Sequence, residues 1–292
     1  MNSDKNIDDS LSEITLELTP EENQRNLLGN PLWISPKDIM VESAISSVIG
    51  ARESQQDSCY VDVEEDGNAI GIVCDGMGGL AGGEIASQNA VRMFVEDYEK
   101  VRHELTNFYS FFLEEMIELD TMVAELTNGN GELLSAGTTL VAVSIKNGNF
   151  QWVSVGDSKI YVLRGDQLYC MVKEHNYLTL LNERLQEGSI SVQEYTSEVK
   201  RGAALISYLG MGNISIIDAY PKPVELMEGD IIILCSDGLY KALSEQQITE
   251  IIHSYSDDLN MAINVLQEQA AIAAGRVQDN TSIVMLSYRA KS

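Results

Sequence analysis

The stretch AIGIVCDGMGG, residues 69–79, joins a run of apolar residues to an aspartate and a set of glycines. The run from Ala69 to Cys74 contains no polar residue, which predicts a buried strand. Asp75 follows directly, and the glycines after it predict a turn before a helix that begins near Glu84. The stretch therefore predicts a carboxylate held at the end of a buried strand.

The same arrangement recurs along the chain. Five aspartates stand at or near a boundary of an apolar strand, usually followed by a small residue: Asp57, Asp75, Asp157, Asp237 and Asp279. Strand ends are rigid, so carboxylates placed there can converge with little reorganisation. Clustered carboxylates repel one another unless a cation neutralises them, and they select hard cations such as Mg²⁺ and Mn²⁺. The pattern favours a metal site, although a single Asp-Gly pair is usually only a turn.

Periodicity defines the other expected elements. Strands are expected at residues 43–50, 58–63, 69–74, 138–146, 150–156, 159–164, 167–172, 231–235 and 281–288, and the four between 138 and 172 are expected to form a meander. Apolar spacing of three and four predicts helices from Glu84 to about Val101, from Leu105 to Leu126, and from Leu259 to a stop at Gly275. Residues 176–213 are expected to be helical and irregular. Ser244 and Gln247 form a capping-box pattern.

The order of these elements predicts the fold class. Helices come in two groups between runs of antiparallel-looking strands, which favours an α+β fold over a βαβ repeat. We expect a four-layer sandwich, in which two antiparallel β-sheets are flanked by α-helices. Residues 1–38 are acidic and lack periodicity, so we interpret them as a flexible leader before a single domain at 39–292.

Composition excludes several kinds of partner. The 292 residues include 19 Lys+Arg against 45 Asp+Glu, a formal net charge of −26. This charge argues against nucleic acids and anionic membranes as partners, because both carry the same sign. The start MNSDKNIDDS is unlike a signal peptide, and no apolar run has the length of a membrane span. Four scattered cysteines predict reduced thiols in a cytoplasmic protein, and zinc is not expected.

Two other motif interpretations compete with a carboxylate metal site. Residues 62–67 resemble the start of a calcium loop, but Val73 stands at the twelfth position, where a bidentate glutamate is required. Residues 76–81 match the GxGxxA dinucleotide fingerprint between a strand and a helix. Against it, Asp75 would lie beside the pyrophosphate with the same sign of charge. The downstream order also lacks a second βαβ unit.

The ordered set of motifs resembles the PPM family, the type 2C metal-dependent protein phosphatases, in its bacterial form. The similar segments are GARESQQD (50–57), VCDGMGG (73–79), SAGTT (135–139), VGDSK (155–159), EH (174–175), LG (209–210), CSDGL (235–239) and QDNTS (278–282). They follow the family's order and cover about residues 43–288. The fold that the resemblance implies, a β-sandwich flanked by helices, agrees with the fold expected from periodicity.

The resemblance implies a role for each matched residue. Asp75 should bridge two Mn²⁺ or Mg²⁺ ions, the Gly76 carbonyl should bind one of them, and Asp237 and Asp279 should complete the other. Asp57 should lie close by as an indirect ligand. Asp157 matches a position that shares a weak third ion with Asp237. Arg52 should hold the phosphate oxygens, a task suited to its planar fork.

The implied activity is hydrolysis of phosphoserine and phosphothreonine in proteins by a water that two metals activate. The implied partners are phosphorylated protein substrates and a cognate serine/threonine kinase, and we expect a monomer. The chain departs from common family residues at Gln56, Met77, Lys159 and Glu174. The alternative function is a catalytically weak, PPM-like module that binds phosphoproteins and regulates them.

Overall fold

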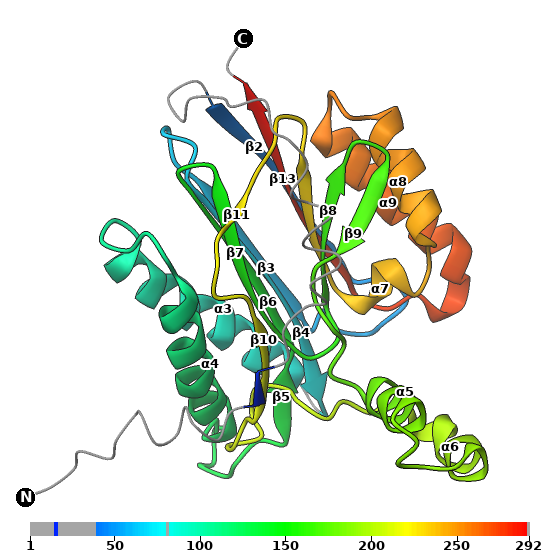
Figure 1. Ribbon diagram of the computed structural model, residues 1–292. Coiled ribbons are helices and arrows are strands. Elements are labelled where there is room, and N and C mark those ends of the chain that lie inside the picture. The colour runs from blue at the N-terminus through cyan, green and yellow to red at the C-terminus, as the bar shows by residue number, and fades with distance from the viewer. Residues whose placement is uncertain (1–14, 17–38, 80–81, 291–292) are drawn as a thin grey trace, which may run out of the picture.

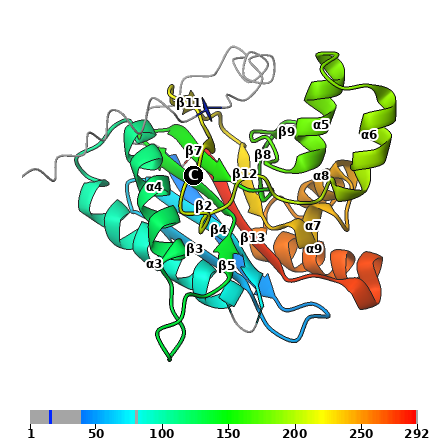
Figure 2. The same ribbon diagram turned by 90° about the horizontal axis from the view of Figure 1, so that it is seen from below.

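The computed structural model describes residues 15–16, 39–79 and 82–290. Two β-sheets pack face to face, and helices cover the outer face of each (Figure 1). The view from below shows the same layers, with α3 and α4 on one side and α8 and α9 on the other (Figure 2). This arrangement confirms the predicted α+β sandwich of antiparallel sheets flanked by helices.

The larger sheet contains eight described strands. Six lie in the order β1 (Thr15–Leu16), β10 (Ile216–Ala219), β7 (Asn149–Val155), β6 (Leu140–Lys146), β4 (Ala69–Gly78) and β3 (Asp57–Val63). Two short strands are attached to it, β11 (Val224–Glu225) beside β7 and β5 (Ala136–Thr138) beside β4. Every described pair is antiparallel except β1 with β10. Strands β3 and β4 are antiparallel neighbours, and their register pairs Asp57 with Asp75.

The smaller sheet contains five described strands, all antiparallel. Their order is β2 (Ile39–Val48), β13 (Thr281–Ala290), β12 (Ile231–Cys235), β8 (Lys159–Arg164) and β9 (Gln167–Cys170). The central strand β12 is buried along its whole length. Its apolar sequence therefore reflects cover on both faces.

The predicted meander at residues 138–172 is wrong in one respect. Strands β6 and β7 belong to the larger sheet, whereas β8 and β9 belong to the smaller one. The chain crosses between the sheets at residues 156–158, where Gly156 has a φ of 103° that suits glycine. Strands β6, β7 and β8 are buried along most of their length, so local alternation could not show which sheet each one joins. The crossing places Asp157 between the two sheets.

The helices divide between the two outer faces. Helices α3 (Gly82–Val101) and α4 (Tyr109–Ala124) cover the larger sheet, and α7 (Asp237–Tyr240), α8 (Glu245–Ser254) and α9 (Leu259–Ala274) cover the smaller one (Figure 1). Helices α5 (Tyr177–Gln186) and α6 (Val192–Glu198) project away from both, with 3₁₀ turns at Val199–Arg201 and Gly275–Val277. The predicted capping box at Ser244 is present, and Gly275 ends α9 with a φ of 58°.

The predicted helix at residues 105–126 starts later than expected. Helix α4 begins at Tyr109, because the Asn107 side chain accepts a hydrogen bond from the Tyr109 backbone N–H and so favours a turn. Phe108 still packs in the core, which explains why it fitted the helical pattern.

Three apolar cores fill the three interfaces between the four layers. Phe94 and Phe112 lie between the larger sheet and its helices. Trp152 lies between the two sheets, and Ile263 of α9 packs against the smaller sheet. Each buried side chain of this size contributes on the order of 2 kcal/mol. The two sheets are thus held in one rigid sandwich, which positions their strand ends relative to each other.

Most of the predicted leader, residues 1–38, lies outside the described residues. Its described part is β1, which pairs in parallel with Ile216 and Ile217 of β10. Within the described part of the chain, no helix has the length and apolar character needed to cross a membrane.

Candidate metal centre

The two sheets bring all five predicted aspartates to one end of the sandwich. Asp57 begins β3 opposite Asp75 of β4. From the smaller sheet, Asp237 begins α7 directly after β12, and Asp279 lies just before β13. Asp157 lies in the crossing between β7 and β8. Because neighbouring strands run antiparallel, these alternating starts and ends of strands fall at the same edge.

Asp75 shows how close the carboxylates lie. Burial raises the pKa of its carboxyl well above the ordinary range, and the charges of the other carboxylates raise it further, with Asp57 and Asp237 as the strongest. The backbone of Asp75 is fixed by its neighbours. Its N–H donates to Thr139 Oγ1 at 3.0 Å, and its carbonyl accepts from the Thr138 hydroxyl at 3.0 Å. A buried negative group held this rigidly calls for a positive partner.

Two of the aspartates each have one buried carboxylate oxygen that accepts no hydrogen bond. Asp57 Oδ2 accepts a hydrogen bond from Ser236 Oγ at 2.7 Å, but its buried Oδ1 has no hydrogen-bond partner. Burial raises the pKa of Asp57 to about 6, against the opposing effect of the Ser236 and Ser282 hydroxyls. The Oδ1 atom of Asp237 is likewise buried and unpartnered. Buried carboxylate oxygens without donors are costly, and a cation would satisfy them.

Arg52 lies beside these carboxylates, in the loop between β2 and β3. Its Nη2 atom is 2.5 Å from Asp279 Oδ2, and 58% of the side chain is exposed. The hydrogen bond to Asp279 raises the pKa of the guanidinium. The exposed part of the fork remains able to reach an incoming anion.

Asn280 anchors the loop that carries Arg52. Its amide donates to the carbonyls of Ile49 at 2.8 Å and Ser54 at 3.0 Å, and its oxygen accepts from the Gln56 N–H at 2.8 Å. In the sequence, Asn280 stands out only as part of the segment QDNTS, residues 278–282. Its position directly after Asp279 was the available signal.

Gly76 cannot be replaced without moving the backbone. A Cβ atom there would collide with the carbonyl oxygens of Gly83 and Gln56. The Gly76 N–H donates to the Gln56 carbonyl at 3.0 Å, so the turn after Asp75 is packed against the start of α3 and the end of the Arg52 loop.

Lys241 is a site residue that the sequence analysis missed. Its Nζ lies 2.5 Å from Asp237 Oδ2 and 3.7 Å from Asp157 Oδ2. Burial lowers the pKa of Lys241, but the hydrogen bond and charge of Asp237 outweigh that effect and raise it, so the ammonium stays charged. Asp157 is buried, and burial raises the pKa of its carboxyl while Lys241 opposes the change. The four-residue spacing from Asp237 was the available signal, once a helix is expected there.

The five aspartates are spread more widely than the ligands of a single ion. Within the described residues, one acidic trio has oxygens within 4.8 Å of one another, and it lies elsewhere, at Asp97, Glu115 and Glu118. In the candidate centre, Arg52 holds Asp279 and Lys241 holds Asp237. A centre for two ions about 3.5–4 Å apart also spreads its ligands more widely than a centre for one.

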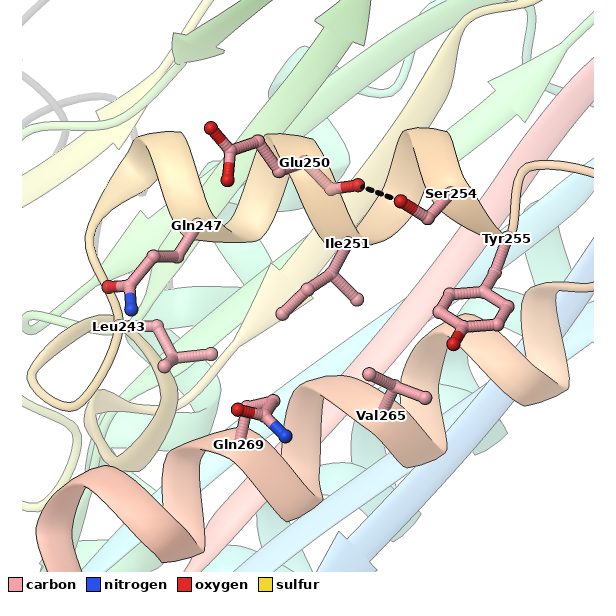
Figure 3. A pocket seen from close by; sticks show the side chains of 8 residues that line it. All are labelled: Leu243, Gln247, Glu250, Ile251, Ser254, Tyr255, Val265 and Gln269. Carbon is pink, nitrogen blue, oxygen red and sulfur yellow. Dashed lines mark hydrogen bonds between the residues drawn. The ribbon is translucent and has the colours of Figure 1, made fainter.

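A separate hollow lies on the far face of the smaller sheet, between α8 and α9 (Figure 3). Its volume is about 390 Å³, and residues such as Ile251, Tyr255 and Val265 line it. None of the five aspartates lines this hollow. The hollow is therefore not part of the candidate metal centre.

Comparison with known proteins agrees with this geometry. A family model described as Protein phosphatase 2C matches residues 46–274. The serine/threonine phosphatase stp of Listeria welshimeri is 27% identical over 237 residues, which are 80% of this chain and 90% of that protein.

Solved structures also share the fold. The PPM Ser-Thr phosphatase MsPP of Mycobacterium smegmatis, in complex with cacodylate, is 27% identical with a TM-score of 0.65, covering 84% of this chain and 97% of that one. The catalytic domain of the serine threonine protein phosphatase PstP, in complex with two manganese ions, has a TM-score of 0.68 at 24% identity and covers 86% and 99%. The last likeness concerns the fold alone.

Proposed function

The chain belongs to the protein phosphatase 2C family, and from this premise we propose that it is a metal-dependent phosphatase of phosphoserine and phosphothreonine in proteins. One observation carries the proposal. Five aspartates from different elements meet at one end of the sandwich, with Arg52 beside them. Carboxylates supply sites for divalent cations, and the guanidinium supplies a site for a phosphate group.

The residues present fit divalent cations. Asp57 and Asp237 each have a buried carboxylate oxygen without a hydrogen-bond donor, and Asp75 lies close to other negatively charged carboxylates. We assign Asp75 as the ligand shared by two Mn²⁺ or Mg²⁺ ions, with the Gly76 carbonyl on one. Asp237 and Asp279 would hold the other, and Asp57 would lie close by as an indirect ligand. Asp157 and Asp237 form the candidate site for a weaker third ion.

When bound, the ions would neutralise the carboxylates and activate a water for attack on phosphorus. The chain's own residues bind and orient the substrate. Arg52 presents its exposed nitrogens to the phosphoryl oxygens, while Asp279 holds the other side of the fork. Because phosphoryl transfer depends mainly on positioning and charge stabilisation, this one clamp should matter strongly.

The substrates in this proposal are phosphorylated proteins, so a serine/threonine kinase that phosphorylates them is the expected functional partner. We further propose that the protein acts as a monomer in the cytoplasm. The four cysteines are unpaired, in keeping with a reducing compartment.

The test is hydrolysis of a phosphothreonine peptide by the purified chain. We expect turnover with Mn²⁺, loss of turnover in EDTA, and recovery when Mn²⁺ is restored. Asp75→Asn, purified in parallel, controls for contaminating phosphatases and should be inactive throughout. A folded, freshly metallated sample that binds phosphopeptides without hydrolysing them would instead support the binding-module alternative.

A further inference from the structure

Lys241 occupies a specific place between two carboxylates of the candidate centre. Its ammonium contacts Asp237 Oδ2 at 2.5 Å and reaches Asp157 Oδ2 at 3.7 Å. Within the described residues, no other cationic side chain forms an ion pair with either aspartate. These two aspartates are the pair to which the family resemblance assigns a third metal ion.

The fold fixes the start of the lysine side chain. Helix α7 begins directly after β12, and the Lys241 backbone N–H donates to the Asp237 carbonyl at 3.0 Å. The Ser236 N–H in turn donates to the Ser282 carbonyl at 3.1 Å, which ties the start of α7 to β13. The four-residue spacing therefore places the ammonium on the same side of α7 as the Asp237 carboxylate.

The two oxygens of Asp237 have different surroundings. Oδ2 takes the lysine ammonium, whereas Oδ1 is buried and has no hydrogen-bond partner. The ion pair thus leaves Oδ1 for the two core ions and occupies Oδ2. A further divalent cation between Asp157 and Asp237 would have to displace the ammonium or lie against it, and like charges at such short range repel.

We propose that Lys241 is a built-in cation that takes the place of a third metal ion between Asp157 and Asp237. It is a positioning residue, because it holds Asp237 in the orientation that presents Oδ1 to the core ions. The inference rests on the proposed two-ion centre. It implies that this chain binds two ions firmly and takes a third only when the lysine side chain, 54% exposed, swings away.

The experiment counts the Mn²⁺ ions bound by metal-free protein in equilibrium dialysis, up to millimolar free Mn²⁺. Wild type should hold about two ions per chain. Lys241→Met should hold about one more, with an affinity on the order of millimolar, because a site with few carboxylates is mostly water-coordinated. Lys241→Arg keeps the cation and should match wild type. Lys200→Met removes an exposed lysine from the Val199–Arg201 turn and should also match wild type.

Thermal unfolding in EDTA supplies a second readout. Lys241→Met should lower the midpoint of the metal-free protein, because Asp157 and Asp237 lose their counterion, and Lys241→Arg should restore it. If Lys241→Met does not fold, Lys241→Gln removes the charge and keeps a polar tip.

The outcomes distinguish the role of Lys241 from the proposed two-ion centre. Equal binding of a third ion by wild type and Lys241→Met, or no third ion in Lys241→Met, overturns the role of Lys241 while leaving the two-ion proposal standing. Wild type that binds no Mn²⁺ overturns the proposed function itself. An extra ion in Lys241→Met alone, with the midpoint lowered in EDTA, supports the inference.

Discussion

At the scale of single residues, the side chains of the candidate centre use one polar atom in a hydrogen bond or ion pair within the protein. A second polar atom of the same side chain is left without a partner or exposed. Asp57 and Asp237 each use one oxygen in a hydrogen bond or ion pair and keep the other unpartnered. Arg52 uses one side of its fork on Asp279 and remains largely exposed on the other. This division lets the protein hold the site in shape while leaving ligand atoms for cations and phosphate.

The first prediction separates metal binding from phosphate binding. Asp75→Asn should lower kcat by several orders of magnitude, because the charge shared by both ions is lost. Arg52→Ala should lower kcat/KM by about 10²-fold, the scale of losing one charged clamp. Titration calorimetry with Mn²⁺ should show normal binding in Arg52→Ala and impaired binding in Asp75→Asn. Arg52→Lys, which keeps the charge without the fork, should fall between wild type and Arg52→Ala. The opposite pattern of metal binding would show that the two roles are misassigned.

The second prediction concerns Asn280, which is 5% exposed and makes three hydrogen bonds to the Arg52 loop. Asn280→Ala should cost about 2–4 kcal/mol in the free energy of unfolding, because three hydrogen bonds between a buried side chain and the loop backbone are lost. Urea denaturation measures the cost, and hydrogen exchange should show faster opening at residues 49–56. Asn260→Ala, at an exposed position on α9, is the control and should change stability little. Unchanged exchange in the loop would show that Asn280 does not anchor it.

At the scale of elements, the packing of α4 against α3 buries a carboxyl group that the centre does not use. Glu115 of α4 is 3% exposed, and its Oε1 has no hydrogen-bond partner. Burial raises the pKa of Glu115 to about 8, and the charges of Asp97 and Glu118 raise it further, while Lys100 opposes them. The helix pair is therefore most stable when this carboxyl group is protonated.

The third prediction follows from that shift. The folded-state pKa lies above the unfolded value of 4.5, so the folded protein binds the proton more tightly. The contribution of Glu115 is complete below pH 4.5 and is lost as pH rises toward 8, at up to about 1.4 kcal/mol per pH unit. Glu115→Gln should match wild type near pH 4.5 and be more stable at pH 8. Urea denaturation across this range measures the difference between the two proteins, and Glu114→Gln at an exposed position is the control. Parallel stability curves for Glu115→Gln and wild type would contradict the assignment.

At the scale of the whole molecule, the candidate centre joins the two sheets. Asp57 and Asp75 come from the larger sheet, whereas Asp237 and Asp279 flank strands of the smaller one. Ions bound by all four would link the sheets at this end, in addition to the apolar core between them. The formal net charge of −26 opposes compaction, so cations should also act through general screening.

The fourth prediction distinguishes these two effects of cations. Mn²⁺ at about 100 times its dissociation constant should add roughly 2.7 kcal/mol to the free energy of unfolding and raise Tm by about 5–10 °C. NaCl at matched ionic strength should give a smaller rise, because it screens charge without binding the centre. Asp75→Asn should lose most of the Mn²⁺ effect and keep the NaCl effect. Equal rises in both salts for wild type would show that screening alone is at work.

Local sequence patterns were sufficient for much of the fold. The apolar runs predicted the core of most strands, including β12, because burial on both faces leaves no place for polar residues. The spacing of Phe94, Phe112 and Met116 predicted the buried faces of two helices, and Ser244 and Gly275 marked helix ends. The aspartates at strand boundaries were visible as candidates for the same reason, since each is a local departure from an apolar pattern. The short strands β10 and β11 and the one-turn helix α7 were not predicted. Elements of two to four residues are too short to show a periodic pattern of apolar residues.

What local pattern could not supply was the pairing of distant segments. Whether β8 joins the sheet of β7 depends on its pairing with a strand more than sixty residues away, Ile231–Cys235. The alternation of apolar and polar residues along β8 would be the same in either sheet. The hydrogen bonds of Asn280 to the Arg52 loop span 224 to 231 residues, and the burial of Glu115 depends on the helix packed against it. Lys241 meets Asp157 only because β12 and β8 are neighbours. Sequence therefore determined which side chains could do chemistry, since residue type and local period suffice for that. Their meeting was decided by long-range strand pairing and packing, which no single segment encodes.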